Sequence, residues 1–187
     1  FKSASKLIEK IDINIFELKE AFSVIVVNDA STEEKIIDTK SLNNIKSLKL
    51  INMRKNKGHA RCIAAGLKHI SENEDFDYVI PMDGDGEDRP EEIRNFLEKI
   101  KDNPNQSIVG ERVKRSESLI FKICYFFHKI ITYTFTGKFI KFGNYTCLTN
   151  QTVKKLIEDK ATWSSFSGSL AKIDNNLIKS PSIRGSR

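Results

Sequence analysis

The sequence predicts an α/β fold with a mostly parallel sheet, and two patterns along the chain point to it. Continuous apolar, β-branched runs such as residues 22–27 (FSVIVV) are typical of strands buried on both faces of a sheet. Helical repeats of apolar residues, such as residues 57–71, lie between these runs. Strands that alternate with helices usually form a parallel sheet with helices on its faces.

The remaining elements continue this alternation. Residues 48–53 predict a second strand before the helix at 57–71, and residues 76–82 predict a third strand after it. The next helix is expected to begin at Pro90, because proline suits the first turn of a helix. Further elements are expected at 106–112 (strand), 116–136 (long apolar helix), 145–149 (short strand) and from about 151 (helix).

Two of these helices show a clear apolar face. Their apolar residues recur at the helical spacing, which predicts that they pack against the sheet. They are Ala60, Ile63, Ala64 and Leu67 in the first helix, and Ile93, Phe96, Leu97 and Ile100 in the second.

Composition limits the class of protein. The length of 187 residues suits one domain with a sizeable core, so we interpret residues 1–187 as a single domain. The formal charge of +6 suggests an anionic partner: phosphates, an acidic membrane surface or nucleic acid. Three widely spaced cysteines argue against a disulfide framework and against a CxxC zinc site.

Carboxylates gather directly after the third predicted strand, in MDGDGEDRPEEI (82–93). Glu91 and Glu92 follow a proline, at a helix start whose positive end favours acids. Asp83 and Asp85 precede that helix, and the glycines beside them allow a tight turn with room for a ligand. Mg²⁺ and Mn²⁺ favour carboxylates together with substrate phosphates, so both residues are candidate metal ligands.

Polar residues also follow two other predicted strands, in NDAS (28–31) and GER (110–112). Ligands of parallel α/β sheets bind beyond the carboxyl ends of the strands. We therefore expect these stretches and the acidic turn to converge on one cleft.

Three other interpretations of the acidic turn compete with the metal site. A haloacid dehalogenase-type phosphatase also has Asp-x-Asp after a strand, but Glu87 stands where Thr or Val is usual, and its charge would repel a phosphate. An EF-hand loop from Asp83 would need Gly at its sixth position and Glu at its twelfth, where this chain has Asp88 and Arg94. A plain helix start explains the glutamates after the proline, but not the two aspartates before it.

Four stretches occur in the order and at the spacing of one known family. They are VIVVNDAS (24–31), NKGHARCIAAGL (56–67), YVIPMDGDGEDRPEEI (78–93) and IVGER (108–112). Together they resemble family 2 glycosyltransferases with the GT-A fold. The nearest are the polyprenyl-phosphate sugar transferases, such as dolichyl-phosphate mannosyltransferases and bactoprenol glucosyltransferases. The resemblance covers roughly residues 1–150.

The resemblance implies a binding site for the sugar donor. Asp29 would accept a hydrogen bond from the nucleotide base, next to Asn28, which stands where the family more often has Asp. Asn56, Lys57 and Gly58 would lie against the nucleotide-sugar.

The resemblance also implies the residues of the chemical step. Asp83 would hold the ribose or the metal, and Asp85 would be the main ligand of Mg²⁺ or Mn²⁺. Asp88 would lie near the sugar or acceptor, and Arg112 near the phosphates. We interpret His59 as a helix-start residue.

The chain departs from the family pattern at two places. The family normally begins with a strand carrying a Pro-x-Tyr-Asn-Glu-like motif, and KSASKLIEKI (2–11) is similar to the helix that follows it. We therefore expect the first strand to be missing and the chain to be truncated at both ends. GNYTCL (143–148) stands where family members often have Asp-Phe-Arg, and lacks both charges.

The apolar helix at 116–136 lies in a basic part of the chain. From Arg112 to Lys141 there are seven basic residues and one acid, Glu117. Charges interrupt the helix too often for it to span a bilayer, so we expect either an interfacial helix on a membrane surface or a core helix. Nucleic acid is not expected, because the aromatic residues fall within this apolar helix.

The resemblance implies an inverting glycosyltransferase at the cytoplasmic face of the membrane. It would move a sugar from a UDP- or GDP-linked donor to a polyprenyl phosphate. The alternatives are a soluble glycosyltransferase acting on a saccharide hydroxyl, a phosphatase, and a non-catalytic module that binds nucleotide-sugars.

Overall fold

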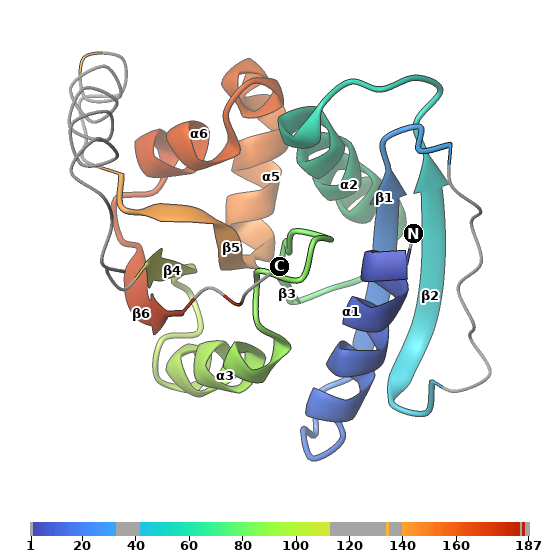
Figure 1. The fold of residues 1–187 in the computed structure, drawn as a ribbon. Coiled ribbons are helices and arrows are strands. Elements are labelled where there is room, and N and C mark those ends of the chain that lie inside the picture. The colour runs from blue at the N-terminus through green and yellow to red at the C-terminus, as the bar shows by residue number, and fades with distance from the viewer. Residues whose placement is uncertain (1, 33–41, 113–133, 135–139, 184, 186–187) are drawn as a thin grey trace, which may run out of the picture.

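The structure is a computed structural model, and it describes residues 2–32, 42–112, 134, 140–183 and 185 (Figure 1). The strands are β1 (Phe22–Asn28), β2 (Ile45–Asn52), β3 (Tyr78–Val79), β4 (Ile108–Arg112), β5 (Phe142–Thr149) and β6 (Ile178–Ser182). The helices are α1 (Lys2–Asn14), α2 (His59–Asn73), α3 (Ile93–Asp102), α5 (Asn150–Glu158) and α6 (Phe166–Ile173), with 3₁₀ turns η1 (Pro90–Glu92) and η2 (Lys160–Trp163).

The described strands form two sheets, in the orders β1-β2 and β3-β5-β4-β6. β1 pairs with β2, and β4 with β6, in parallel, whereas β5 runs antiparallel to both β3 and β4. The predicted α/β fold is confirmed, but the larger of the two described sheets is mixed. The reason is that β5 starts beside the end of β4, where Phe142 is paired with Glu111.

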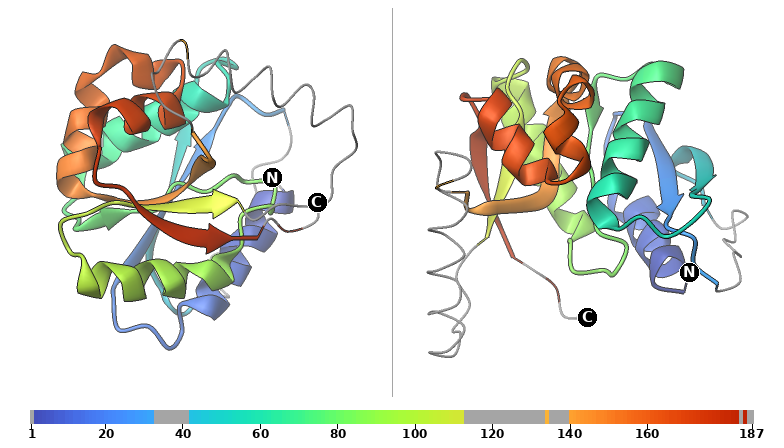
Figure 2. Two further views of the ribbon diagram at one scale, coloured as in Figure 1. Left: turned by 90° about the vertical axis from the view of Figure 1, so that its left-hand side faces the viewer. Right: turned by 90° about the horizontal axis from the view of Figure 1, so that it is seen from above.

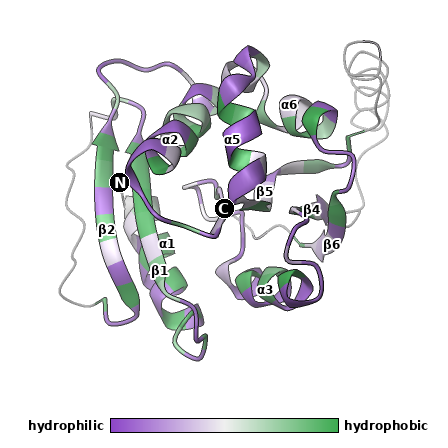
Figure 3. Cartoon of the chain, turned by 180° about the vertical axis from the view of Figure 1, so that it is seen from behind, coloured by the Kyte–Doolittle hydropathy of each residue, from purple (hydrophilic) through white to green (hydrophobic). Residues whose placement is uncertain are grey.

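Helices cover both faces of the larger sheet (Figure 2). On one face, α1 and α3 pack over side chains that include Ile108 and Cys147. On the other face, α2, α5 and α6 pack over side chains that include Val109 and Leu148. Neighbouring residues of a strand point to opposite faces, so each strand supplies both halves of the core. Figure 3 shows hydrophobic and hydrophilic residues together on the helices, as expected when one side of each is buried.

The predicted helices are confirmed where the structure describes them. The apolar face of α3 is buried as expected, at Ile93, Phe96, Leu97 and Ile100. In α2, Ala64 and Leu67 are buried with Cys62 and Gly66. The predicted helix at 116–136 falls almost wholly outside the described residues. Among the helices that the structure does describe, none has the length and apolarity needed to cross a membrane.

Two strands differ from expectation. β1 was predicted to be buried on both faces, but its residues other than Asn28 are half-buried or exposed, since within the described chain only β2 pairs with it. β3 has two residues rather than seven, because only Tyr78 and Val79 pair with β5 and Pro81 has no N–H to donate.

Candidate functional site

Asp29, directly after β1, holds the turn that leads into α2. Its Oδ1 accepts the backbone N–H of Lys57 at 2.7 Å, and its Oδ2 accepts that of Gly58 at 2.8 Å. These bonds to the charged form, led by the one from Lys57, lower the pKa of Asp29 below 3.8. Gly58 has φ +88° and ψ 158°, a conformation essentially reserved for glycine, so the turn depends on both residues.

Asn28, the neighbour of Asp29, has a structural role. It is 6% exposed, and its Nδ2 donates to Asn52 Oδ1 at 2.9 Å, which ties β1 to β2. Its Oδ1 accepts the N–H of Ser31 at 3.1 Å. An amide can donate and accept in this way, whereas an ionised aspartate can only accept.

The acidic turn after β3 is held by its own carboxylates. Asp88, which is 7% exposed, accepts the N–H of Asp83 on Oδ2 at 2.8 Å. Asp85 is exposed and accepts the N–H of Glu87 on Oδ1 at 3.0 Å. Gly86 has φ +84°, and a methyl group added at Gly86 would meet nothing within 4 Å. The turn therefore has the tight geometry and the open space predicted from its glycines.

Three polar side chains from separate elements meet above this turn. His59, the first residue of α2, places Nε2 at 3.2 Å from Asp83 Oδ1. Asn144, near the start of β5, places Nδ2 at 2.6 Å from the same His59 nitrogen and 3.4 Å from Asp83 Oδ1. Because His59 follows Gly58, the ends of β1 and β3 and the start of β5 are linked by an unbroken series of contacts. The structure therefore brings NDAS and the acidic turn together, whereas GER ends β4 beside β6, and a single cleft shared by all three stretches stays a prediction.

The chain after β6 also packs against the acidic turn. Ile183 donates its N–H to Glu92 Oε1 at 2.7 Å, and Gly185 donates its N–H to the carbonyl of Glu87 at 2.8 Å. Glu92 is 9% exposed, so its role extends beyond the helix start predicted from sequence.

The predicted site residues are thus mostly brought together. The contacts above join Asp29, Lys57, Gly58, Asp83 and Asp88, and Asp85 lies in the same turn. Asn56 is exposed in the loop before α2. The backbone of Arg112 pairs with Ser182 at the end of β4, but its side chain is outside the described part. Sequence reasoning missed Asn144 and the polar contacts of His59. The contact between His59 and Asn144 joins residues 85 positions apart.

The chemistry of the turn fits a hard divalent cation. Ionised carboxylates offer about four lone-pair positions each, and oxygen ligands suit Mg²⁺ and Mn²⁺. Among the residues that the structure describes, however, no group of three or more His, Cys, Asp and Glu side chains lies close enough to hold a metal ion. A cation held by Asp83 and Asp85 would need ligands of other kinds.

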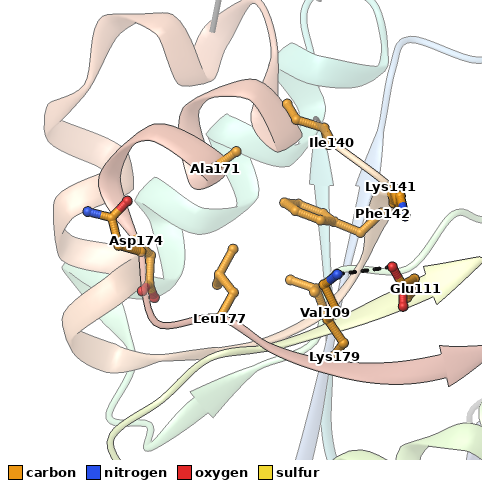
Figure 4. A pocket seen from close by; sticks show the side chains of 10 residues that line it. Val109, Glu111, Ile140, Lys141, Phe142, Ala171, Asp174, Leu177 and Lys179 are labelled. Atoms are coloured by element: carbon orange, nitrogen blue, oxygen red, sulfur yellow. Dashed lines mark hydrogen bonds and ion pairs between the residues drawn. The ribbon is translucent and has the colours of Figure 1, made fainter. Parts of the chain in front are cut away.

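A pocket of about 320 Å³ lies beside the start of β5 (Figure 4). Phe142, the first residue of β5, lines it. Val109 and Leu177 add apolar surface. The polar lining consists of Glu111, Lys141, Asp174, Asn175 and Lys179. Lys179 and Glu111 form an ion pair at 3.2 Å.

Comparison with known proteins identifies the family. The model of "Glycosyl transferase family 2" matches residues 6–152. An uncharacterized protein, MJ0544, from Methanocaldococcus jannaschii is 30% identical over 110 residues, or 58% of this chain and 48% of that protein. An uncharacterized glycosyltransferase, sll0501, from Synechocystis is 28% identical over 118 residues, or 61% of this chain and 35% of that protein. The matches therefore span about half of the first relative and about a third of the second.

A solved structure supports the fold. The crystal structure of S. aureus TarS 1-349 matches 95% of this chain and 55% of its own, with a TM-score of 0.56 and 15% identity. At that identity the likeness concerns the fold alone, and it agrees with the GT-A α/β architecture predicted from sequence.

Proposed function

Because this chain belongs to glycosyltransferase family 2, we propose that it moves a sugar from a nucleotide-diphosphate-sugar to a polyprenyl phosphate, with inversion in a single displacement. One observation carries the proposal. Asp29 contacts Gly58, and His59 contacts Asp83. These contacts bring together, at one edge of the sheets, the stretches that the family resemblance assigns to binding of the sugar donor.

In this proposal the donor lies along the turn before α2. Lys57 and Gly58 are held by the Asp29 carboxylate, so the backbone beside the nucleotide is fixed before the donor arrives. Asn56 and Lys57 are exposed and supply an amide and a positive charge toward the donor, which is UDP- or GDP-linked. Arg112 is proposed to lie beside the phosphates.

Asp83 and Asp85 are the proposed ligands of Mg²⁺ or Mn²⁺. A bound cation would neutralise charge on the departing nucleoside diphosphate. Asp88 is buried against Asp83 and orients its backbone. A phosphate acceptor is already anionic and needs little help from a general base, whereas a hydroxyl acceptor requires one, for which Asp88 is the first candidate.

The proposed acceptor places the protein at the cytoplasmic face of a membrane. The basic stretch from Arg112 to Lys141 supports this, because it suits an anionic surface. The helix expected at 116–136 supports it in its interfacial alternative, and not in its core alternative.

The test is a transfer assay with radiolabelled UDP- and GDP-sugars, a polyprenyl phosphate and Mn²⁺. We expect label in the organic phase, and a loss of about 100-fold or more in Asp85→Ala, because charge stabilisation of the leaving group is removed. Unchanged turnover in Asp85→Ala would refute the metal assignment. Label found only in water-soluble product would refute the lipid acceptor.

One observation favours a second candidate, transfer to a saccharide hydroxyl. The pocket beside Phe142 carries carboxylates at Glu111 and Asp174. Lys141 and Lys179 balance these two carboxylates, so the lining has no net positive charge to attract a phosphate. Its carboxylates accept hydrogen bonds from hydroxyl groups, and the aromatic ring offers an apolar surface to a sugar.

Glu111→Gln tests this second candidate. We expect it to raise the KM for a saccharide acceptor while leaving the affinity for the nucleotide unchanged. Glu74→Gln is the matched control, because it removes an ion pair with Lys49 away from the pocket. Equal effects of the two substitutions on the KM would argue against the pocket as an acceptor site.

A further inference from the structure

The chain that leaves β6 is attached to the acidic turn through its backbone. Ile183, the first residue after β6, donates its N–H to Glu92 Oε1 at 2.7 Å. Gly185 donates its N–H to the carbonyl oxygen of Glu87 at 2.8 Å. We call these two attached residues, Ile183 and Gly185, the strap.

Apolar packing contributes little to this attachment. Ile183 is 55% exposed, and Gly185 has no side chain to bury. The strap nevertheless lies close to the turn, because a methyl group added at Gly185 would be 3.1 Å from the carbonyl oxygen of Gly86. Hydrogen bonds between the strap and the turn therefore hold it, and a segment held in this way opens at a low cost in free energy.

A series of hydrogen bonds leads from the strap to Asp85. Glu87 accepts from Gly185 on its carbonyl oxygen, and its own N–H donates to Asp85 Oδ1 at 3.0 Å. Asp85 is exposed, and a methyl group added at Gly86, between the two acids, would meet nothing within 4 Å. Packing around Gly86 therefore does not fix this part of the turn, and the direction of the Asp85 carboxylate depends on hydrogen bonds such as those of Glu87.

Glu92 is an unusual residue to find at the other attachment. It is 9% exposed, and its Oε2 is buried without a hydrogen-bond partner among the residues that the structure describes. A buried carboxylate with one unpaired oxygen is a poor source of stability, because that oxygen has lost its water. Its paired oxygen, Oε1, accepts the N–H of Ile183, so the bond to the strap is the function that its position suggests.

We propose that Glu92 is a positioning residue of the donor site: it holds the strap on the acidic turn, and the strap holds Glu87, which orients Asp85. This inference rests on the proposed function, which puts Asp85 beside the departing nucleoside diphosphate. Glu92 is buried and acts through the strap, not on the substrate itself. The series joins residues 92 and 183, which are 91 positions apart in the chain.

Amide hydrogen exchange of the purified chain, resolved by residue with NMR, tests the series without any substrate. We expect Glu92→Ala to raise the exchange rates of the Ile183, Gly185 and Glu87 amides about tenfold or more, since the lost bond is one to a charged group. The Ile183 amide reports the bond that is removed. The other two amides report whether its loss reaches the turn. Circular dichroism establishes that each variant is folded.

Two matched variants separate the bond from the charge. Glu92→Gln keeps an oxygen for the N–H of Ile183, and its NH₂ replaces the oxygen that has no partner among the described residues, so we expect wild-type exchange. Glu91→Ala removes the neighbouring acid, which is exposed and pairs with Arg89 at 3.7 Å, and should also leave exchange unchanged. If the charge at the helix start were what matters, both variants would behave like Glu92→Ala.

Gly185→Ala loosens the strap from its other end. Its methyl group would press on the carbonyl oxygen of Gly86 at 3.1 Å, so we expect faster exchange at Glu87 with the Glu92 side chain intact. Combining Gly185→Ala with Glu92→Ala should be no worse than the more damaging single change, because both act through the strap. Fully additive effects would show that the two residues act independently, and would overturn the inference.

Nucleotide binding and transfer show whether the strap serves the donor site. We expect calorimetry with UDP and with GDP, each in the presence of Mn²⁺, to give weaker binding in Glu92→Ala and wild-type binding in Glu92→Gln. The kcat/KM for transfer should fall about 10- to 100-fold in Glu92→Ala, since a small misplacement far from the chemistry can cost that much.

Failure of the inference differs from failure of the proposed function. Faster exchange confined to the Ile183 amide overturns the inference, and so does wild-type nucleotide affinity in a Glu92→Ala chain whose turn exchanges faster. Both results leave the proposed function standing. A wild-type chain that binds neither UDP nor GDP and transfers no sugar overturns the proposed function, and with it the role of Glu92 in the donor site.

Discussion

The backbone N–H of Asp83 donates to the carboxylate of Asp88 at 2.8 Å. Asp88 is 7% exposed and therefore points into the protein, at the base of the acidic turn. The bond fixes the backbone of Asp83, whose own carboxylate faces His59 and Asn144. Asp88 acts in this structure as a support for Asp83.

Substitutions at Asp88 separate support from proton transfer. Asn keeps an oxygen that can accept the Asp83 N–H, so we expect Asp88→Asn to retain transfer within about threefold. Asp88→Ala should lose about tenfold or more, because a hydrogen bond to a charged group contributes about 1.5–3 kcal/mol. Steady-state kinetics at varied donor concentration measures the loss of transfer in each of the two variants. If Asp88 were a general base, Asn would be as damaging as Ala, with losses of about 10²–10⁴.

Asp29→Asn should weaken nucleotide binding several-fold. The Asp29 carboxylate accepts two backbone N–H groups, whereas an asparagine has one acceptor oxygen and presents its NH₂ to the other N–H. The turn at Lys57 and Gly58 would then shift. Calorimetry with UDP or GDP and Mn²⁺ measures the change. Wild-type affinity in Asp29→Asn would show that the turn needs only one of the two bonds.

Gly58→Ala should destabilise the fold by about 1–3 kcal/mol through its backbone alone. Gly58 has φ +88°, and an added methyl group would meet nothing within 4 Å, so crowding plays no part. Gly84→Ala is the matched control, because its surroundings are equally open and its φ lies outside the left-handed region. The free energy of unfolding, measured with urea, should change by less than about 0.5 kcal/mol in the control. Equal losses in both variants would contradict the backbone explanation.

The sequence predicted features that depend on neighbouring residues. The apolar face of α3 follows from spacing alone, and the structure buries all of it. β6 was not predicted, because IKSPS is short, polar and contains Pro181, which only an edge strand tolerates. The resemblance named Asp29 and Asp83 as site residues, but the contact of His59 with Asn144 joins residues 85 positions apart, and no local pattern carries that information.

Asp12 is a stability residue that no sequence pattern singles out. It is 5% exposed, and its side chain accepts the N–H groups of Asn43, Asn44 and Ile45, which fixes the start of β2 on α1. Burial raises the pKa of Asp12, but these hydrogen bonds outweigh it and hold the pKa below 3.8. Asp12→Ala should lower the free energy of unfolding by about 2–4 kcal/mol, since buried N–H groups lose a charged partner.

The stabilisation that Asp12 provides depends on pH, and the direction of this dependence follows from the lowered pKa of Asp12. A lowered pKa in the folded state means that the ionised form is the stabilising one. The difference in unfolding free energy between wild type and Asp12→Ala should be full above pH 3.8 and shrink as the pH falls through the lower folded value. Urea unfolding at several pH values measures it. Asp102→Ala, which alters an exposed acid at the end of α3, is the control and should change stability by less than about 0.5 kcal/mol. A difference that grew on acidification would mean that Asp12 stabilises the fold in its protonated form, contrary to its three N–H donors.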